Sequence, residues 1–150
     1  MYHAIIRSKV RDVFNQLNKG KYDLVFASLA PNFEHWFIGD HALSGLRTSL
    51  PITRQWYERL FRIFPNIHFD LKAVVVQGWP WDTTVTIEWD DSYILLNGER
   101  RWNCGVHIVH FKWAKADSIH IYCDTELLLK NMAIQGQAGV KDVSLPPLIG

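Results

Sequence analysis

The sequence predicts an α+β domain in which N-terminal helices pack on one face of a strongly curved, antiparallel or mixed sheet. Up to about residue 64 the apolar residues recur with helical spacing, and from residue 67 onward they alternate with polar residues as in strands. Turn signals separate the later runs, as expected for strands joined by hairpins. The chain has 150 residues, a length that favours one domain spanning 1–150. One core is therefore expected between the helices and the sheet.

The first half of the chain reads as three helices and one short strand. The expected elements are a helix over residues 4–18, a helix over 22–29, a strand over 33–38 and a helix over 51–64. Gly20 and Pro31 follow the first two helices as stop signals, and Pro65 ends the last one. A loop through Gly45 joins the strand to the last helix. These helices would present their apolar sides to the sheet.

The second half begins with two strand patterns, over 67–76 and 84–90, on either side of a turn at 78–82. In the second pattern Val85, Ile87 and Trp89 share the inward face, and Asp91 continues it. A carboxylate on an apolar face is costly to bury without a partner, so its presence there indicates a function. Alternatively, Asp91 is a turn residue if the strand ends one residue earlier.

A β-hairpin over 102–124 follows a turn at Asn97-Gly98. With 114–117 as its turn, Val109 would face Tyr122 and His107 would face Asp124. This register predicts a histidine–carboxylate pair on an apolar wall, where pKa values are commonly shifted. Alternatively, Asp124 is the N-cap of a last short helix and His107 is a core histidine that carries no function.

The same register assigns an apolar outer face to the sheet. The residues expected there are Ile108, His110, Ile119 and Ile121. Such a face is too apolar to be left in water, so a homodimer through it is expected. After the last helix, glycines and Pro146-Pro147 predict a loose C-terminal tail over about 133–150.

Charge and composition exclude several function classes. Lys plus Arg number 16 and Asp plus Glu 15, which gives no electrostatic reason to expect nucleic acid or a membrane as a partner. The sequence has no apolar run long enough to cross a membrane and no signal-peptide pattern, so a cytoplasmic location is expected. Cys104 and Cys123 are expected to be free thiols. No short-range metal motif is present, and neither a metal nor a cofactor is expected.

The order of elements resembles that of the nuclear-transport-factor-2-like (NTF2-like) superfamily, and within it the SnoaL-like polyketide cyclases, ketosteroid isomerases and limonene-type epoxide hydrolases. The resemblance covers residues 4 to about 132. It rests on Gly20, Gly45, Phe64-Pro65, Gly105-Val106 and the final strand Ser118–Asp124. It implies a cone-shaped fold that encloses a deep pocket, and often a homodimer through the outer face of the sheet.

The resemblance also places functional positions. Epoxide hydrolases use two acids and an arginine, and the acids match Asp91 and Asp124, while Trp89 stands at the arginine position. Their water-holding tyrosine and asparagine fall on His35 and Phe37. Ketosteroid isomerases place an oxyanion-stabilising acid where this chain has His107, and their general base falls near His35 or Trp36. Cyclases use a pocket acid that Asp91 or Asp124 would supply. No subfamily's full set is present.

The leading interpretation is an enzyme that acts on a small, largely apolar molecule by acid–base chemistry. Its expected working groups are Asp91, Asp124, His107 and His35. The residues expected to bind the substrate are Trp36, Phe37, Trp56, Trp89, Tyr93, Val109, Phe111 and Tyr122. The alternative is a non-catalytic module that binds an apolar ligand in the same pocket. A third interpretation is metal binding by His35, His107 and Asp124, or by His110 and His120.

Overall fold

The computed structural model describes all residues from 1 to 150 and has four α-helices and a six-stranded sheet. The helices are α1 (Tyr2–Leu17), α2 (Asp23–Ser28), α3 (Leu50–Ile63) and α4 (Thr125–Gln137), followed by the short 3-10 helix η1 (Lys141–Ser144). The strands are β1 (Leu29–Phe37), β2 (Gly45–Arg47), β3 (His68–Trp79), β4 (Asp82–Ile94), β5 (Arg100–Lys112) and β6 (Lys115–Cys123). The predicted α+β class is confirmed, and β2 is the one strand that the sequence did not predict.

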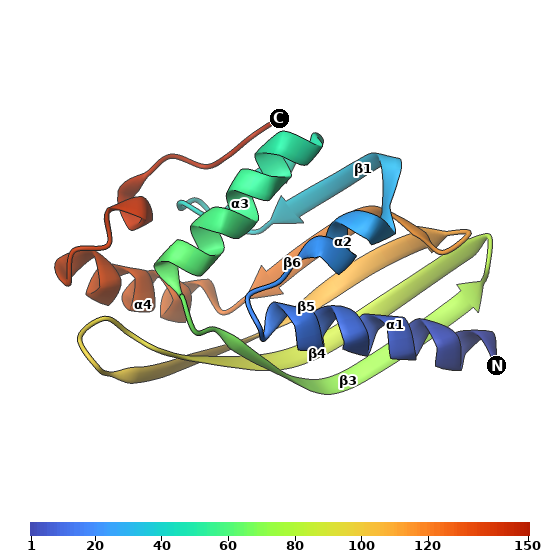
Figure 1. The fold of residues 1–150 in the computed structure, drawn as a ribbon, viewed down its shortest axis with the longest axis horizontal. Helices are drawn as coiled ribbons and strands as arrows, with labels where there is room; N and C mark the ends of the chain where they lie inside the picture. The colour runs from blue at the N-terminus through green and yellow to red at the C-terminus, as the bar shows by residue number, and fades with distance from the viewer.

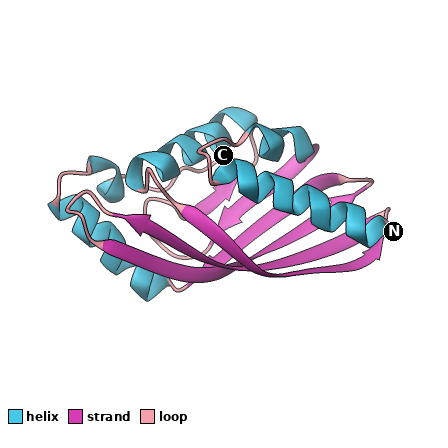
Figure 2. Ribbon diagram, turned by 60° about the horizontal axis from the view of Figure 1, so that its bottom comes forward, coloured by secondary structure: helices cyan, strands magenta, loops and turns pink.

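The sheet is mixed and open, with strand order β2-β1-β6-β5-β4-β3. Only β1 and β6 run parallel; every other neighbouring pair is antiparallel. Helices α1, α2 and α3 lie over one face of the sheet, and α4 lies at the end where β4 turns into β5 (Figure 1). Figure 2 shows the sheet curving beneath the helical layer. The inner face of the sheet and the helices thus enclose one interior.

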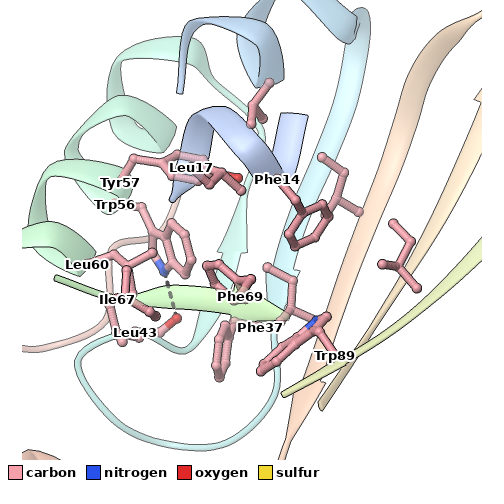
Figure 3. Packing of buried hydrophobic residues seen from close by; sticks show 14 of the residues in the cluster. Phe14, Leu17, Phe37, Leu43, Trp56, Tyr57, Leu60, Ile67, Phe69 and Trp89 are labelled. Atoms are coloured by element: carbon pink, nitrogen blue, oxygen red, sulfur yellow. Dashed lines mark hydrogen bonds between the residues drawn. The ribbon is translucent and has the colours of Figure 1, made fainter. Parts of the chain in front are cut away.

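The core fills the space between the two layers. On α1 the buried residues recur every three or four positions, at Ile6, Val10, Phe14 and Leu17, so that one stripe of the helix faces the sheet. Figure 3 shows Leu17 and Phe14 pointing from α1 toward side chains of α3 and the sheet. None of the helices is both long enough and apolar enough to cross a lipid bilayer.

The predicted register of the β5–β6 hairpin is wrong. Val109 pairs with Ile119 and not with Tyr122. The turn is formed by Trp113 and Ala114, whose φ angles of 52° and 63° are the two left-handed conformations of a tight hairpin turn. The pairing then slips by one residue between His110 and Phe111, which is a β-bulge.

The bulge decides which side chains face the core. Side chains alternate along a strand, so an extra residue moves every later side chain to the opposite face. Ile119 and Ile121, predicted for the outer face, are 6% and 2% exposed and belong to the core. Tyr122 lies on the outer face instead. The outer face therefore carries Trp36, Val75, Ile108, His110, His120 and Tyr122.

The C-terminal residues are held in place, which differs from the predicted loose tail over about 133–150. Helix α4 continues to Gln137, and the last residues run back along α3 (Figure 1). Arg59 donates one Nη1 hydrogen bond to the carbonyl of Pro146 at 2.7 Å, and Arg47 donates one to the carbonyl of Leu148 at 2.8 Å. Both arginines are buried. Hydrogen bonds from arginine side chains therefore fix a segment whose own sequence resembles a flexible tail.

Candidate active site

Asp91 lies on the inner face of β4, as the alternation predicts, because β4 continues to Ile94. The residue is 7% exposed, and its carboxyl Oδ1 is buried without any hydrogen-bond partner. Burial raises the pKa of Asp91 from 3.8 to about 7, an effect that the backbone N–H of Asn103 partly offsets and nearby Asp90 slightly increases. At neutral pH this carboxyl group therefore exists in both protonated and ionised forms.

Asp91 lines an interior cavity of about 40 Å³. Thirteen of the sixteen lining residues are hydrophobic, so the carboxyl group faces an apolar space. Figure 3 shows apolar lining residues converging from α1, α3, the sheet and the loops beside them: Leu17, Phe37, Leu43, Trp56, Leu60, Ile67, Phe69 and Trp89. The volume is enough for a few water molecules. The carboxyl group of Asp91 is thus part of the wall of a small, largely apolar chamber.

A second cavity, of about 50 Å³, lies next to the first. Its wall includes Val109 and Phe111, two of the predicted substrate-binding residues. Leu17, Tyr57 and His107 line both cavities. These three side chains therefore form the partition between them, and the interior can be described as one divided pocket.

His107 is a neutral hydrogen-bond donor in this pocket. Trp89 donates its Nε1–H to Nδ1 of His107 at 2.8 Å, so the imidazole proton resides on Nε2. Burial lowers the pKa of His107 to about 3, which keeps the ring uncharged at neutral pH. The predicted pair of His107 with Asp124 is not formed. The Nε2–H group of His107 remains available to a molecule in either cavity.

Gly105 makes the Trp89–His107 contact possible. It pairs with Trp89 across β4 and β5. A Cβ atom at residue 105 would lie 2.7 Å from the Trp89 ring and would also collide with the carbonyl oxygen of Tyr122. The absent side chain lets the indole lie against the strand, where its N–H reaches His107.

A second chain of polar groups ends at Tyr57. Arg47 donates its Nε–H to Nδ1 of His35 at 3.1 Å, so Nε2 of His35 carries the proton and donates to Tyr57 Oη at 3.2 Å. All three residues are buried. Desolvation lowers the pKa of Arg47 to about 10, which is still high enough for the guanidinium to remain charged at neutral pH. Its hydrogen bonds go to His35 and to backbone carbonyls, and no carboxylate pairs with it. Because Tyr57 accepts from His35, its own hydroxyl hydrogen is free to point toward the cavities.

The structure separates the predicted catalytic residues. Asp91 and His107 line the same cavity. His35 lies behind Tyr57 and lines neither cavity. Asp124 is exposed, and its Oδ1 accepts a hydrogen bond from the backbone N–H of Leu127 at 3.0 Å, so it caps α4. The prediction that Asp124 points into the pocket is wrong because the bulge in β6 reversed its face.

The predicted substrate-binding residues divide in a similar way. Phe37, Trp56 and Trp89 line the first cavity, and Val109 and Phe111 line the second. Trp36 and Tyr122 lie on the outer face of the sheet, where their rings are 5.2 Å apart, and so do not reach the pocket.

Tyr93 is buried but lines neither cavity. Its ring stacks on Phe64, and its hydroxyl accepts a hydrogen bond from Asn131. No group of three or more His, Cys, Asp or Glu side chains is arranged to hold a metal ion, and the suggested histidine sets are not assembled.

Sequence reasoning missed Asn103, Tyr57 and Cys123, all of which line the first cavity. Asn103 pairs with Asp91 because Leu95 pairs with Glu99 at the turn, whereas a two-residue Asn97-Gly98 turn would have placed Cys104 there. Tyr57 follows Trp56 on the predicted helix, but its partner His35 comes from a distant strand, so no local signal marks it. Burial raises the pKa of Cys123 to about 12, so its thiol stays protonated and is a poor nucleophile.

Comparison with known structures supports a common fold. An NTF2-like protein of unknown function from Burkholderia pseudomallei shares 14% identity, with 84% of this chain and 95% of that chain covered and a TM-score of 0.72. TerC, crystallised with polyporic acid, shares 12% identity, with coverage of 84% and 96% and a TM-score of 0.71. A candidate SnoaL-like polyketide cyclase from Jannaschia sp. shares 13% identity, with coverage of 84% and 90% and a TM-score of 0.64.

A search of curated proteins found no match for the chain. At these identities the solved structures establish the fold, which is NTF2-like as the resemblance implied. The model of the SnoaL-like domain family matches residues 10–118, which include Asp91, His107 and every strand of the pocket wall up to the start of β6. The chain belongs to the SnoaL-like domain family.

Proposed function

We propose that the protein is an enzyme that transfers a proton to or from a small, largely apolar substrate, with Asp91 as its general acid or base. The observation that supports this proposal is the Asp91 carboxyl group, which is buried in an apolar cavity, has a pKa near 7 and leaves one oxygen without a partner. A group that titrates near the working pH is efficient in both directions of proton transfer. The chemistry would be that of a cyclase, isomerase or hydrolase.

Two neutral donors would orient the substrate. The Nε2–H group of His107 and the hydroxyl of Tyr57 both belong to side chains that line the cavities. Because neither group is charged, each is able to hydrogen-bond a carbonyl or developing oxyanion without a large desolvation cost. The guanidinium of Arg47, linked to Tyr57 through His35, would further stabilise negative charge on the substrate side of Tyr57. His35 is then a positioning residue.

The wall of the pocket favours an apolar substrate with few polar groups. Pockets for drug-sized molecules are commonly about 300–1,000 Å³, whereas the two cavities here are about 40 and 50 Å³. A larger substrate therefore requires movement of the partition. Leu17 is the partition residue without a polar role, so Leu17→Ala should improve the KM of bulky substrates with little change in kcat.

The alternative is a binding module that holds an apolar ligand without converting it. Shape and apolar surface are sufficient for that role, whereas catalysis also needs the proton of Asp91. Replacing Asp91 with asparagine keeps the size of the side chain and removes the proton, so this substitution distinguishes the two functions.

The experiment is a turnover screen with epoxides, enones and polycyclic ketides, followed by kinetics of the variants on any substrate found. Asp91→Asn should lower kcat by roughly 10²–10⁴ while ligand affinity stays within about tenfold. Asp124→Asn is the matched control, because it changes an exposed carboxylate that caps α4, and it should retain activity. In the wild type, kcat/KM should report an ionisation near pH 7 that the Asp91→Asn variant lacks.

The proposal fails if a ligand binds equally well to wild type and Asp91→Asn and no compound turns over. It also fails if Asp91→Asn and Asp124→Asn retain the same activity on a substrate that the wild type converts.

A further inference from the structure

Three exposed tryptophans gather at one end of the molecule. Trp79 ends β3, Trp81 lies in the β3–β4 turn and Trp113 lies in the β5–β6 turn. Their exposed fractions are 66%, 51% and 66%. Both turns lie at the right-hand end in Figure 1, near the start of α1. The rings of Trp79 and Trp81 stack at 6.1 Å, and Trp81 lies 6.1 Å from Trp113. We call these three residues the tryptophan tip.

The area of the tryptophan tip is comparable to that of the largest apolar patch on a typical monomer. With up to about 250 Å² for one tryptophan side chain, the three expose roughly 400 Å². Apolar patches of this size on a monomer are often functional.

Tryptophan is an unfavourable residue type at position 113 of the turn. Its φ is 52°, in the left-handed region where a bulky residue is strained and glycine or asparagine is preferred. The turn is nevertheless fixed, because the N–H of Trp113 donates to the carbonyl of Pro80 at 2.7 Å and so joins the two hairpins. The indole is therefore presented to solvent at the cost of local strain, which indicates a role outside the fold.

Charges of both signs surround the tryptophan tip, but the acids are paired with a histidine whereas the lysines have no acidic partner. His110 bridges Asp82 and Asp117, with one ring nitrogen 2.6 Å from each carboxylate, so the two nearest acids are engaged. Lys112 and Lys115 flank the β5–β6 turn and are exposed. Exposed indoles beside lysines suit the boundary between anionic lipid headgroups and acyl chains.

We propose that the tryptophan tip docks on the surface of an anionic lipid bilayer. The net charge of the whole chain, +1, gives no reason to expect a membrane partner, but a net charge does not describe where the charged residues lie. Docking would also place a groove of about 320 Å³ at the lipid surface, since Ala114 and Lys115 line it. Val10, Val13, Ser28 and Phe111 line both this groove and the second interior cavity. An apolar molecule leaving the bilayer would thus have a short path through the groove to the second interior cavity.

Vesicle binding of the whole protein tests this proposal without any substrate, so its outcome is separate from that of the proposed function. The probes are vesicles of phosphatidylcholine with about 30% phosphatidylglycerol, used for co-sedimentation and for quenching of tryptophan emission by brominated acyl chains. Trp113→Gly removes one ring and relieves the positive φ, so this variant should fold at least as well as the wild type. Trp102→Ser is the matched control, because Trp102 is 62% exposed but lies toward the opposite end of β5.

The wild type should bind these vesicles with quenching of its emission, and Trp113→Gly should weaken the partition coefficient about tenfold or more. Lys112→Gln should weaken it about fivefold at low salt, and Trp102→Ser should leave it unchanged. The proposal is overturned if the wild type does not bind, or if Trp102→Ser loses as much binding as Trp113→Gly. It is equally overturned if the wild type stays off the vesicles and Trp113→Gly instead abolishes self-association in light scattering.

Discussion

Replacing Asp91 with asparagine should stabilise the protein in a pH-dependent way. Burial raises the pKa of Asp91 from 3.8 to about 7, and a shift of about three units corresponds to about 4 kcal/mol between the two protonation states. Below pH 4 the carboxyl group is protonated in both the folded and the unfolded chain. Between pH 4 and 7 the unfolded chain releases the proton and the folded chain keeps it, so the wild type loses stability as the pH rises.

Asparagine has no proton to release, so the Asp91→Asn variant avoids this loss. The free energy of unfolding of the variant, relative to the wild type, should therefore increase by about 2.5 kcal/mol between pH 5 and pH 8. Urea unfolding at the two pH values measures both proteins, and the double difference cancels any constant cost of the amide group. Asp124→Asn is the control, since an exposed N-cap accepts either residue. Equal pH dependence of wild type and Asp91→Asn would refute the reasoning.

Four further outcomes are expected. Trp113→Gly should raise the free energy of unfolding by about 1 kcal/mol, measured by thermal unfolding, because it relieves a positive φ; a loss of stability would contradict this. His110 should titrate above its ordinary pKa in NMR, because two carboxylates accept from its ring, and its bridge should weaken once the pH exceeds that raised pKa. Arg59→Met should speed proteolysis of the C-terminal residues several-fold, since a buried charge-assisted hydrogen bond is worth about 1.5–3 kcal/mol; an unchanged cleavage rate would refute it. We propose a homodimer through the outer sheet face around Trp36 and Tyr122, and light scattering that gives a monomer at micromolar concentration would count against it.

Most of the fold follows from local patterns in the sequence. The stripe on α1 and the alternation on β4 each depend on neighbours in sequence, so the sequence predicts both elements and the inward position of Asp91. The short strand β2 carries no such pattern, because its three residues pair with β1 only in the folded chain. Because β2 is not predicted, the contact of Arg47 with His35 is not predicted either.

The β5–β6 hairpin shows why register is harder to predict than strand identity. Trp113 and Ala114 form a turn that normally requires glycine or asparagine, so the sequence offers no signal for it. The bulge after that turn then reverses every later side chain. The apolar character of Ile119 and Ile121 favours the inward face, where the structure places them. A turn at residues 114–117 predicts the opposite face, and that prediction is wrong.

The protonation state of Asp91 is the property on which the proposed acid–base chemistry depends, and NMR measures it directly. The side-chain carboxyl carbon of Asp91, assigned by its loss in the Asp91→Asn variant, is followed between pH 4 and pH 9. The account predicts a midpoint near the value of about 7 that burial gives this group. A midpoint at the ordinary value for aspartate, about 4, would mean that the carboxylate is ionised and solvated, and would contradict the proposed role of Asp91.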